Sequence, residues 1–143
     1  MNEKFIGKTE CIRPLWPPTV HRVRAPDDAF ADPKQAALYD FFDGDRSDLD
    51  LYLSIAEEVD ADSIVDIGCG TGSLAVRLAE GGKTVVGVDP AAASLEVARG
   101  KTNAERVRWL LGDATALRDH HANVDLAVMT GNVAQVFITD KDW

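Results

Sequence analysis

The chain has 143 residues and a formal net charge of −9, with 45% hydrophobic and 27% charged residues. This length suits one domain with its own core, and the composition is that of an ordinary soluble globular protein. No window of about 18 residues is continuously apolar, and the first residues lack an apolar signal core, which argues against a membrane span and a secretory leader. Two cysteines, Cys11 and Cys69, are too few for a disulfide framework, so we expect a cytoplasmic location.

The acidic balance predicts that the chain repels nucleic acid and anionic lipid. Residues 1–24 differ, because their basic residues outnumber their acidic ones. The charged residues of this segment are Lys4, Lys8, Arg13, Arg22 and Arg24 against Glu3 and Glu10. We interpret this basic lead as a solvated tail, with a partner-binding arm as the alternative.

Residues 1–33 hold five of the six prolines of the chain. The stretch "PLWPP" (14–18) favours extended or polyproline geometry and prevents a helix. We therefore expect residues 1–33 to form an extended segment that is poorly ordered or lies against the domain, with Trp16 as an anchor. Residues 34–143 are then expected to form the domain itself.

Two helices are predicted ahead of the first strand. The first begins near Asp32 and presents one apolar face, formed by Ala36, Ala37, Phe41 and Phe42. The stretch "DGDRSD" (43–48) ends it. Ser47 is expected to cap the second helix, with Asp50 at the capping-box position. Apolar residues then recur at helical spacing as far as Val59.

Strands and helices alternate from residue 63 onward. Strands are predicted at 63–67, 84–88, 107–111 and 124–129. Helices are predicted at 72–80, between Asp89 and Gly100 with Pro90 at the first helical position, and from near Val133. This alternation is typical of βαβ units with right-handed crossovers, and it predicts an α/β fold with a parallel sheet covered on both faces.

Polar residues and glycines stand at the carboxyl end of each predicted strand. They are Asp66 and Gly68 at the first, Asp89 at the second, Gly112 and Asp113 at the third, and Thr130, Gly131 and Asn132 at the fourth. Ligands of parallel sheets bind at the carboxyl ends of the strands, so these residues are expected to converge on one site.

The loop "DIGCGTG" (66–72) suggests what this site binds. Its glycines permit a tight turn and close approach of backbone to a ligand, and amides at the start of the next helix favour a carboxylate. The acid Asp66 would repel a phosphate and attract a cation. About twenty residues further, Asp89 is placed to accept ribose hydroxyls. Asp113 and the Ala114 amide are suited to an adenine, so the sequence describes an adenosine with a zwitterionic, sulfonium-bearing tail.

With these motifs the sequence resembles the class I methyltransferases that use S-adenosyl-L-methionine. The matching stretches are "VDIGCGTG" (65–72), "VVGVDP" (85–90), "RVRWLLGDATAL" (106–117) and "VDLAVMTGNVAQVF" (124–137). The resemblance spans roughly residues 30–140. It implies a three-layer Rossmann-like sandwich, with about four strands of the family's seven-stranded sheet present.

The resemblance also implies a role for individual residues. Asp66, Gly68 and Gly70 would border the methionine part of the cofactor. Asp89 and Pro90 would contact the ribose, and Asp113 and Ala114 would contact the adenine. The floor of the cleft would be formed by Thr130, Gly131 and Asn132, and Tyr39 would close over the methyl group. No catalytic residue is identified. No metal is expected, because the three histidines lack partners at metal-ligand spacing.

Three other functions fit parts of the sequence. A nicotinamide-binding domain would need a third glycine where Ser73 stands, and it has no need of Asp66. A phosphate-binding loop ending in "GGKT" (81–84) would need a glycine where Arg77 stands. A truncated domain that binds the cofactor without catalysis is the remaining alternative.

Methyl transfer from a sulfonium is an in-line displacement, and a base is needed only if the acceptor must lose a proton. A small-molecule acceptor is expected, because the chain is acidic and lacks the Asn/Asp-Pro-Pro-Tyr motif of base-methylating enzymes. The apolar fourth strand carries neither proline nor lysine, so it is also expected to recruit a second chain at residues 124–129, unless residues 1–33 cover it.

Overall fold

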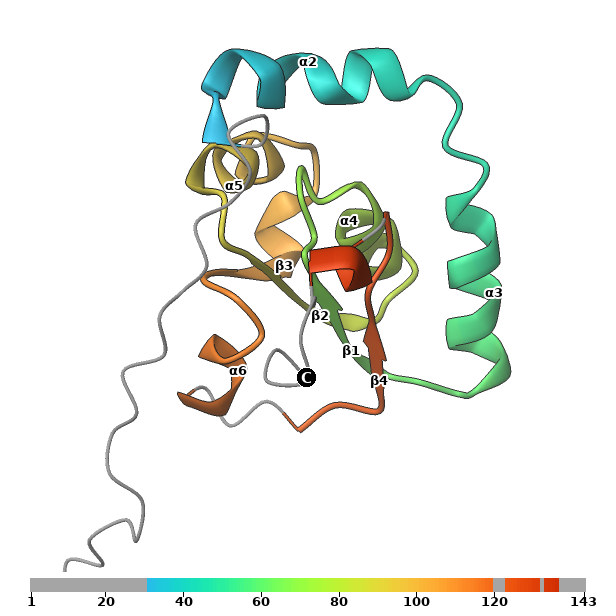
Figure 1. The fold of residues 1–143 in the computed structure, drawn as a ribbon. Coiled ribbons are helices and arrows are strands. Elements are labelled where there is room, and N and C mark those ends of the chain that lie inside the picture. The colour runs from blue at the N-terminus through green and yellow to red at the C-terminus, as the bar shows by residue number, and fades with distance from the viewer. Residues whose placement is uncertain (1–30, 120–122, 132, 137–143) are drawn as a thin grey trace, which may run out of the picture.

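The computed structural model describes residues 31–119, 123–131 and 133–136, and the structural statements below concern these residues (Figure 1). Residues 1–30 lie outside them. The extended segment, its Trp16 anchor and the basic lead therefore remain predictions.

Four strands form one parallel sheet. They are β1 (Ser63–Ile67), β2 (Thr84–Asp89), β3 (Val107–Leu111) and β4 (Leu126–Val128). Their order is β3-β2-β1-β4, and every neighbouring pair is parallel. This confirms the predicted α/β class and the parallel sheet with flanking helices. The fourth strand is shorter than the predicted 124–129.

Helices connect and flank the strands. They are α2 (Pro33–Asp43), α3 (Leu49–Glu58), α4 (Ser73–Glu80), α5 (Ala92–Arg99) and α6 (Ala116–Asp119), with the 3-10 helices η1 (Ala104–Arg106) and η2 (Val133–Val136). The glycines at 81 and 100 end α4 and α5 as predicted. Pro90 is not the first residue of α5, which begins two residues later, because the Asp89 carboxylate holds the Ala91 amide ahead of the helix.

A tryptophan fills the space that glycines leave between the sheet and the helices. A Cβ added to Gly87 on β2 would lie 2.7 Å from the Trp109 ring, and one added to Gly72 would lie 2.4 Å from it. The same Gly72 position approaches Ala98 of α5 at 2.9 Å. The start of α4 and part of α5 therefore cover the face of the sheet that carries Trp109, whose indole N–H donates to the Ala104 carbonyl at 3.0 Å.

The two N-terminal helices pack differently from the prediction. In Figure 1, α2 extends across the top of the molecule and contacts α5, and α3 runs beside the sheet and contacts α4. Ala36 is buried, but Ala37 is exposed and Phe41 is 79% exposed. The apolar face predicted for this helix is therefore wrong at these two positions, because α2 meets α5 through a narrow contact around Ala36.

The capping box predicted for α3 is also absent. The helix begins at Leu49 and no side chain caps it. Ser47 donates its hydroxyl to Asp45, and Asp50 forms an ion pair with Arg77 of α4 instead. A local contact thus takes Ser47, and a tertiary contact takes Asp50.

Candidate functional site

Backbone hydrogen bonds join the carboxyl ends of the strands at one edge of the sheet. The amides of Gly68 and Cys69 donate to the Val88 carbonyl at 2.8 and 3.1 Å, which holds the end of β1 against the end of β2. The amide of Gly112, which follows β3, donates to the Asp89 carbonyl at 3.0 Å. The predicted convergence of these three strand ends is therefore observed.

The fourth strand reaches the same edge through a residue that the sequence analysis did not select. A Cβ added to Gly68 would lie 2.4 Å from a methyl carbon of Val133, so the η2 side chain lies against the glycine loop. Val133 is tied back to Thr130 by a backbone hydrogen bond of 3.3 Å. An apolar residue after a strand gives no sequence signal for this contact, and only the fold reveals it.

The glycine loop is tightly wound and uses its own amides. Gly68, Gly70 and Gly72 have φ values of 70°, 54° and 79°, in the left-handed region where residues with a side chain are strained. The amide of Gly72 donates to the Cys69 carbonyl at 2.8 Å, and those of the preceding glycines bond to β2. These amides therefore hold the loop's shape, and a ligand would contact the loop by other groups.

Asp89 supports the loop with its carboxylate. Oδ2 accepts from the Gly70 amide and Oδ1 from the Ala91 amide, each at 2.8 Å. Burial raises the pKa of Asp89, while these two hydrogen bonds oppose the rise. Each oxygen of a carboxylate has a second lone pair, so the group can also accept ribose hydroxyls without giving up its bonds to the loop.

Asp66 is the most unusual group of the site. Its side chain is 1% exposed, and among the described residues its Oδ1 has no hydrogen-bond partner. Burial, together with the charge of Asp89, raises the pKa of Asp66 to about 7. Buried polar atoms are nearly always paired, so an unpaired carboxylate oxygen beneath a glycine loop marks a place for a ligand or for a proton.

The third strand is followed by a turn built on Asp113. Its Oδ1 accepts from both the amide and the hydroxyl of Thr115. Asp113 and Ala114 are partly buried, and the bond from Gly112 to the Asp89 carbonyl brings this turn next to the second strand. The two residues predicted to read an adenine therefore stand beside the residue predicted to hold the ribose.

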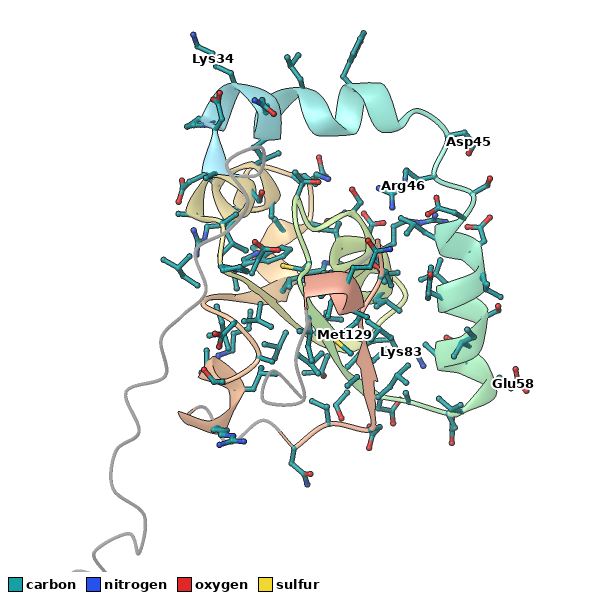
Figure 2. The ribbon with its side chains drawn as sticks, in the orientation of Figure 1. Lys34, Asp45, Arg46, Glu58, Lys83 and Met129 are labelled. Carbon is teal, nitrogen blue, oxygen red and sulfur yellow. The ribbon has the colours of Figure 1, made fainter. Side chains whose placement is uncertain are left out.

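The structure describes some of the remaining predicted site residues and not others. Thr130 is partly buried and Gly131 is exposed, with φ 61°. Met129, labelled in Figure 2, precedes them and is 41% exposed. Asn132 and the side chain of Tyr39 lie outside the described part of the chain, so their roles remain predictions.

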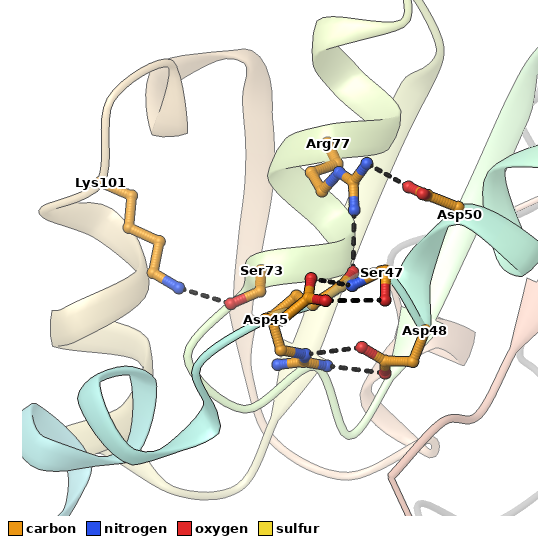
Figure 3. Close-up of polar contacts among 8 residues, drawn as sticks. Asp45, Ser47, Asp48, Asp50, Ser73, Arg77 and Lys101 are labelled. Carbon is orange, nitrogen blue, oxygen red and sulfur yellow. Dashed lines mark hydrogen bonds and ion pairs between the residues drawn. The ribbon is translucent and has the colours of Figure 1, made fainter.

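A network of polar contacts attaches the segment between α2 and α3 to α4 (Figure 3). Arg77 donates to the Arg46 carbonyl at 3.1 Å and pairs with Asp50, while the Arg46 side chain pairs with Asp48. In the sequence, Arg77 stands where a phosphate-loop motif would need a glycine, and the motif gives no other role for it. Its partners are 27 and 31 residues away, so spacing gives no signal for them.

The described residues give little support for a cysteine nucleophile or for a metal site. Burial raises the pKa of the Cys69 thiol, as do the charges of Asp66 and Asp89, which keeps the thiol protonated. Among the described residues, His, Cys, Asp and Glu do not form a group of three or more able to hold a metal ion. No helix in those same ranges is long and apolar enough to cross a membrane.

Comparison with known proteins gives the family. A family model described as a methyltransferase domain matches residues 64–143, which is more than half of the chain. A methyltransferase-named protein of Geobacillus sp. (strain WCH70) is 51% identical over 47 residues, covering 33% of this chain and 19% of that protein. The matched region thus spans about a fifth of that relative's length.

Solved structures show the same fold. A TehB-like SAM-dependent methyltransferase from Corynebacterium glutamicum has a TM-score of 0.60 and 23% identity, covering 78% of this chain and 62% of that one. An O-methyltransferase from Bacillus cereus, solved in complex with SAH, has a TM-score of 0.54 and 19% identity, covering 75% and 56%. By its family-model match, supported by this shared fold, the chain belongs to the methyltransferase-domain family.

Proposed function

We propose that this chain binds S-adenosyl-L-methionine and forms the cofactor-binding part of a methyltransferase with a small-molecule acceptor. The observation that carries the proposal is the buried pair Asp66 and Asp89 beside the glycine loop, at the edge where the strand ends meet. An acid-lined site suits a cationic sulfonium better than a phosphate. The chain's place in the methyltransferase-domain family supports the same cofactor.

The proposed contacts follow the order of the strands. Asp66, Gly68 and Gly70 border the methionine part, and Asp89 with Pro90 holds the ribose. Asp113 and the Ala114 amide read the adenine. Thr130, Gly131 and Asn132 line the cleft, and Tyr39 closes over the methyl group.

In this mechanism the protein mainly positions the reactants. When bound, the cofactor would supply a methyl group activated by its sulfonium, with the neutral thioether as the leaving group. Holding an acceptor in line with that carbon can contribute about 7–11 kcal/mol through positioning alone. We assign no general base, and none is needed unless the acceptor must lose a proton.

A small-molecule acceptor is supported by the charge of the chain. With a net charge of −9, the chain repels the phosphate backbone of nucleic acid, whose binding depends on basic side chains that displace its counterions. An acceptor without a phosphate backbone avoids this repulsion.

We also propose that the chain self-associates through β4. Among the described residues, this strand pairs with β1 on one side and with no strand on the other. An unpaired strand edge offers donors and acceptors to a second chain.

Calorimetry tests the cofactor assignment. S-adenosylhomocysteine should bind and NAD should not, because NAD brings a pyrophosphate close to two buried acids. Asp60 is an exposed acid in the turn before β1, so the variant Asp60→Asn should bind S-adenosylhomocysteine like the parent chain and serves as the control for replacing an acid of the site. Equal affinity for NAD would contradict the proposal.

A methyl-release assay over a panel of small acceptors then tests catalysis. Transfer to at least one of them is expected. Binding of S-adenosylhomocysteine without any transfer would instead favour a cofactor-binding domain that does not catalyse the reaction.

A further inference from the structure

We propose that Asp66 is the residue by which this site distinguishes a sulfonium from the corresponding neutral thioether, and that it releases a proton to solvent when the sulfonium binds. The inference rests on the proposed function and deepens it. It concerns the charge state of the site, which decides how tightly the cationic substrate is held relative to the neutral product.

The surroundings of Asp66 leave its charge uncompensated. The residue pairs in register with Gly87 on one side and Val128 on the other, and neither side chain can donate a hydrogen bond. Within the described ranges, Oδ1 of Asp66 is buried and has no partner. A carboxylate in this setting is stable only if it takes up a proton or if a cation comes close to it.

Asp89 is the member of the pair that keeps its charge. Each of its oxygens already accepts a backbone N–H, and hydrogen bonds to a carboxylate favour its ionised form. Two neighbouring buried acids resist being ionised together. The proton therefore resides on Asp66, in agreement with its pKa, which burial and the charge of Asp89 raise to about 7.

Among the described residues, the charge that acts on Asp66 is the negative charge of Asp89, and no cation offsets it. On β2 the titratable neighbour is Asp89, on the loop it is Cys69, and β4 contributes only apolar residues between 126 and 128. The cations of the flanking helices are engaged elsewhere. Arg77 of α4 contacts Asp50 and the Arg46 carbonyl. Arg99 of α5, whose charge reaches the Cys69 thiol, pairs with Glu96. A cationic ligand would thus bring the positive charge that Asp66 lacks.

The two ligands of a methyl-transfer cycle test this directly. S-adenosylmethionine and S-adenosylhomocysteine share the same adenosine, amino and carboxylate groups, and they differ in the charge on sulfur. Below the pKa of Asp66, sulfonium binding requires the loss of a proton, so its affinity should rise about tenfold per pH unit and level off above pH 7. Thioether binding requires no such loss and should change little through this range.

The experiment is titration calorimetry of both ligands between pH 5.5 and 8, in buffers that differ in ionisation enthalpy. Near pH 6, close to one proton more should be released for the sulfonium than for the thioether. Protons released by groups that respond alike to both ligands cancel in this difference. Asp66→Asn should abolish the difference, and the control Asp60→Asn should retain it.

The outcomes separate the two proposals. If both ligands bind with parallel pH dependence and equal proton release, the inference about Asp66 is wrong and the cofactor assignment stands. If neither ligand binds, both fail. Should Asp66→Asn not fold, the comparison of the two ligands on the parent chain still decides.

Discussion

The amide of Gly70 donates a 2.8 Å hydrogen bond to the carboxylate of Asp89, 19 residues further along the chain. This bond fixes the glycine loop to the end of β2. The other oxygen of the same carboxylate holds the Ala91 amide ahead of α5. One buried acid thus shapes both turns that frame the proposed ribose site, so structure and ligand binding depend on the same group.

Replacement of this acid should therefore have two effects. In Asp89→Ala, each charge-assisted hydrogen bond lost is expected to lower the free energy of unfolding by about 1.5–3 kcal/mol. Affinity for S-adenosylhomocysteine should also fall, by several kcal/mol at most. Urea unfolding and calorimetry measure the two effects separately, with Asp60→Asn as the control. A destabilised variant with unchanged affinity would remove the ribose role and leave the structural one.

The strands and the site edge could be predicted because their signals are local. Short apolar runs such as "SIVDI" and "TVVGV" end in acids or glycines, and parallel pairing brings those ends together. The face of α2 and the cap of α3 could not be predicted, because contacts with α5 and Arg77 override helical spacing. The unpaired oxygen of Asp66 could not be predicted from the sequence either, because it depends on which side chains the neighbouring strands place beside it.

A pair of glycines separates steric crowding from backbone strain. Gly72 and Gly82 have similar φ values of 79° and 88°. A Cβ at Gly72 would lie 2.4 Å from the Trp109 ring, whereas one at Gly82 would meet nothing within 4 Å. Gly82→Ala should lower stability by about 1 kcal/mol, while Gly72→Ala should lower it by at least about 2 kcal/mol. Equal losses in thermal unfolding would show that Trp109 moves aside at no cost.

The stability of the chain should depend on pH through Asp66. Its pKa rises from 3.8 to about 7 on folding, so the native state holds a proton that the unfolded chain releases between these values. The contribution of Asp66 to stability should therefore be greatest below pH 4, fall by up to about 4 kcal/mol as pH rises to 7, and level off above that. Burial raises the pKa of Asp89 too, which adds to the same trend.

Denaturant unfolding at pH 5 and pH 8 checks this expectation. Asp66→Asn cannot ionise, so its stability should change less between the two pH values than that of the parent chain. The difference between the two proteins isolates Asp66 from other titrating groups. A variant as pH-dependent as the parent chain would show that Asp66 is ionised at both pH values.

The contacts of Arg77 should matter more for local order than for global stability. Its side chain is 36% exposed and that of Asp50 is 64% exposed, so their ion pair is expected to contribute less than about 1 kcal/mol. In Arg77→Ala, hydrogen exchange of residues 44–48 should accelerate, because the Arg46 carbonyl also loses its donor. Arg77→Lys should restore this only partly, since one ammonium does not match the two-branched guanidinium. Unchanged exchange in Arg77→Ala would mean that other contacts hold the segment.

The unpaired side of β4 leads to the last prediction. Within the described residues, β4 lies at the edge of the sheet and contains the apolar stretch Leu126–Val128. A second chain can pair with such an edge, and a lysine there discourages pairing. Sedimentation velocity of the purified chain should therefore show species larger than a monomer, increasing with concentration. Ala127 is exposed, so Ala127→Lys should fold and shift the distribution toward monomer, while Ala37→Lys on the exposed side of α2 should not. A parent chain that stays monomeric at every concentration, with β4 amides that exchange freely, would show that this edge recruits no partner.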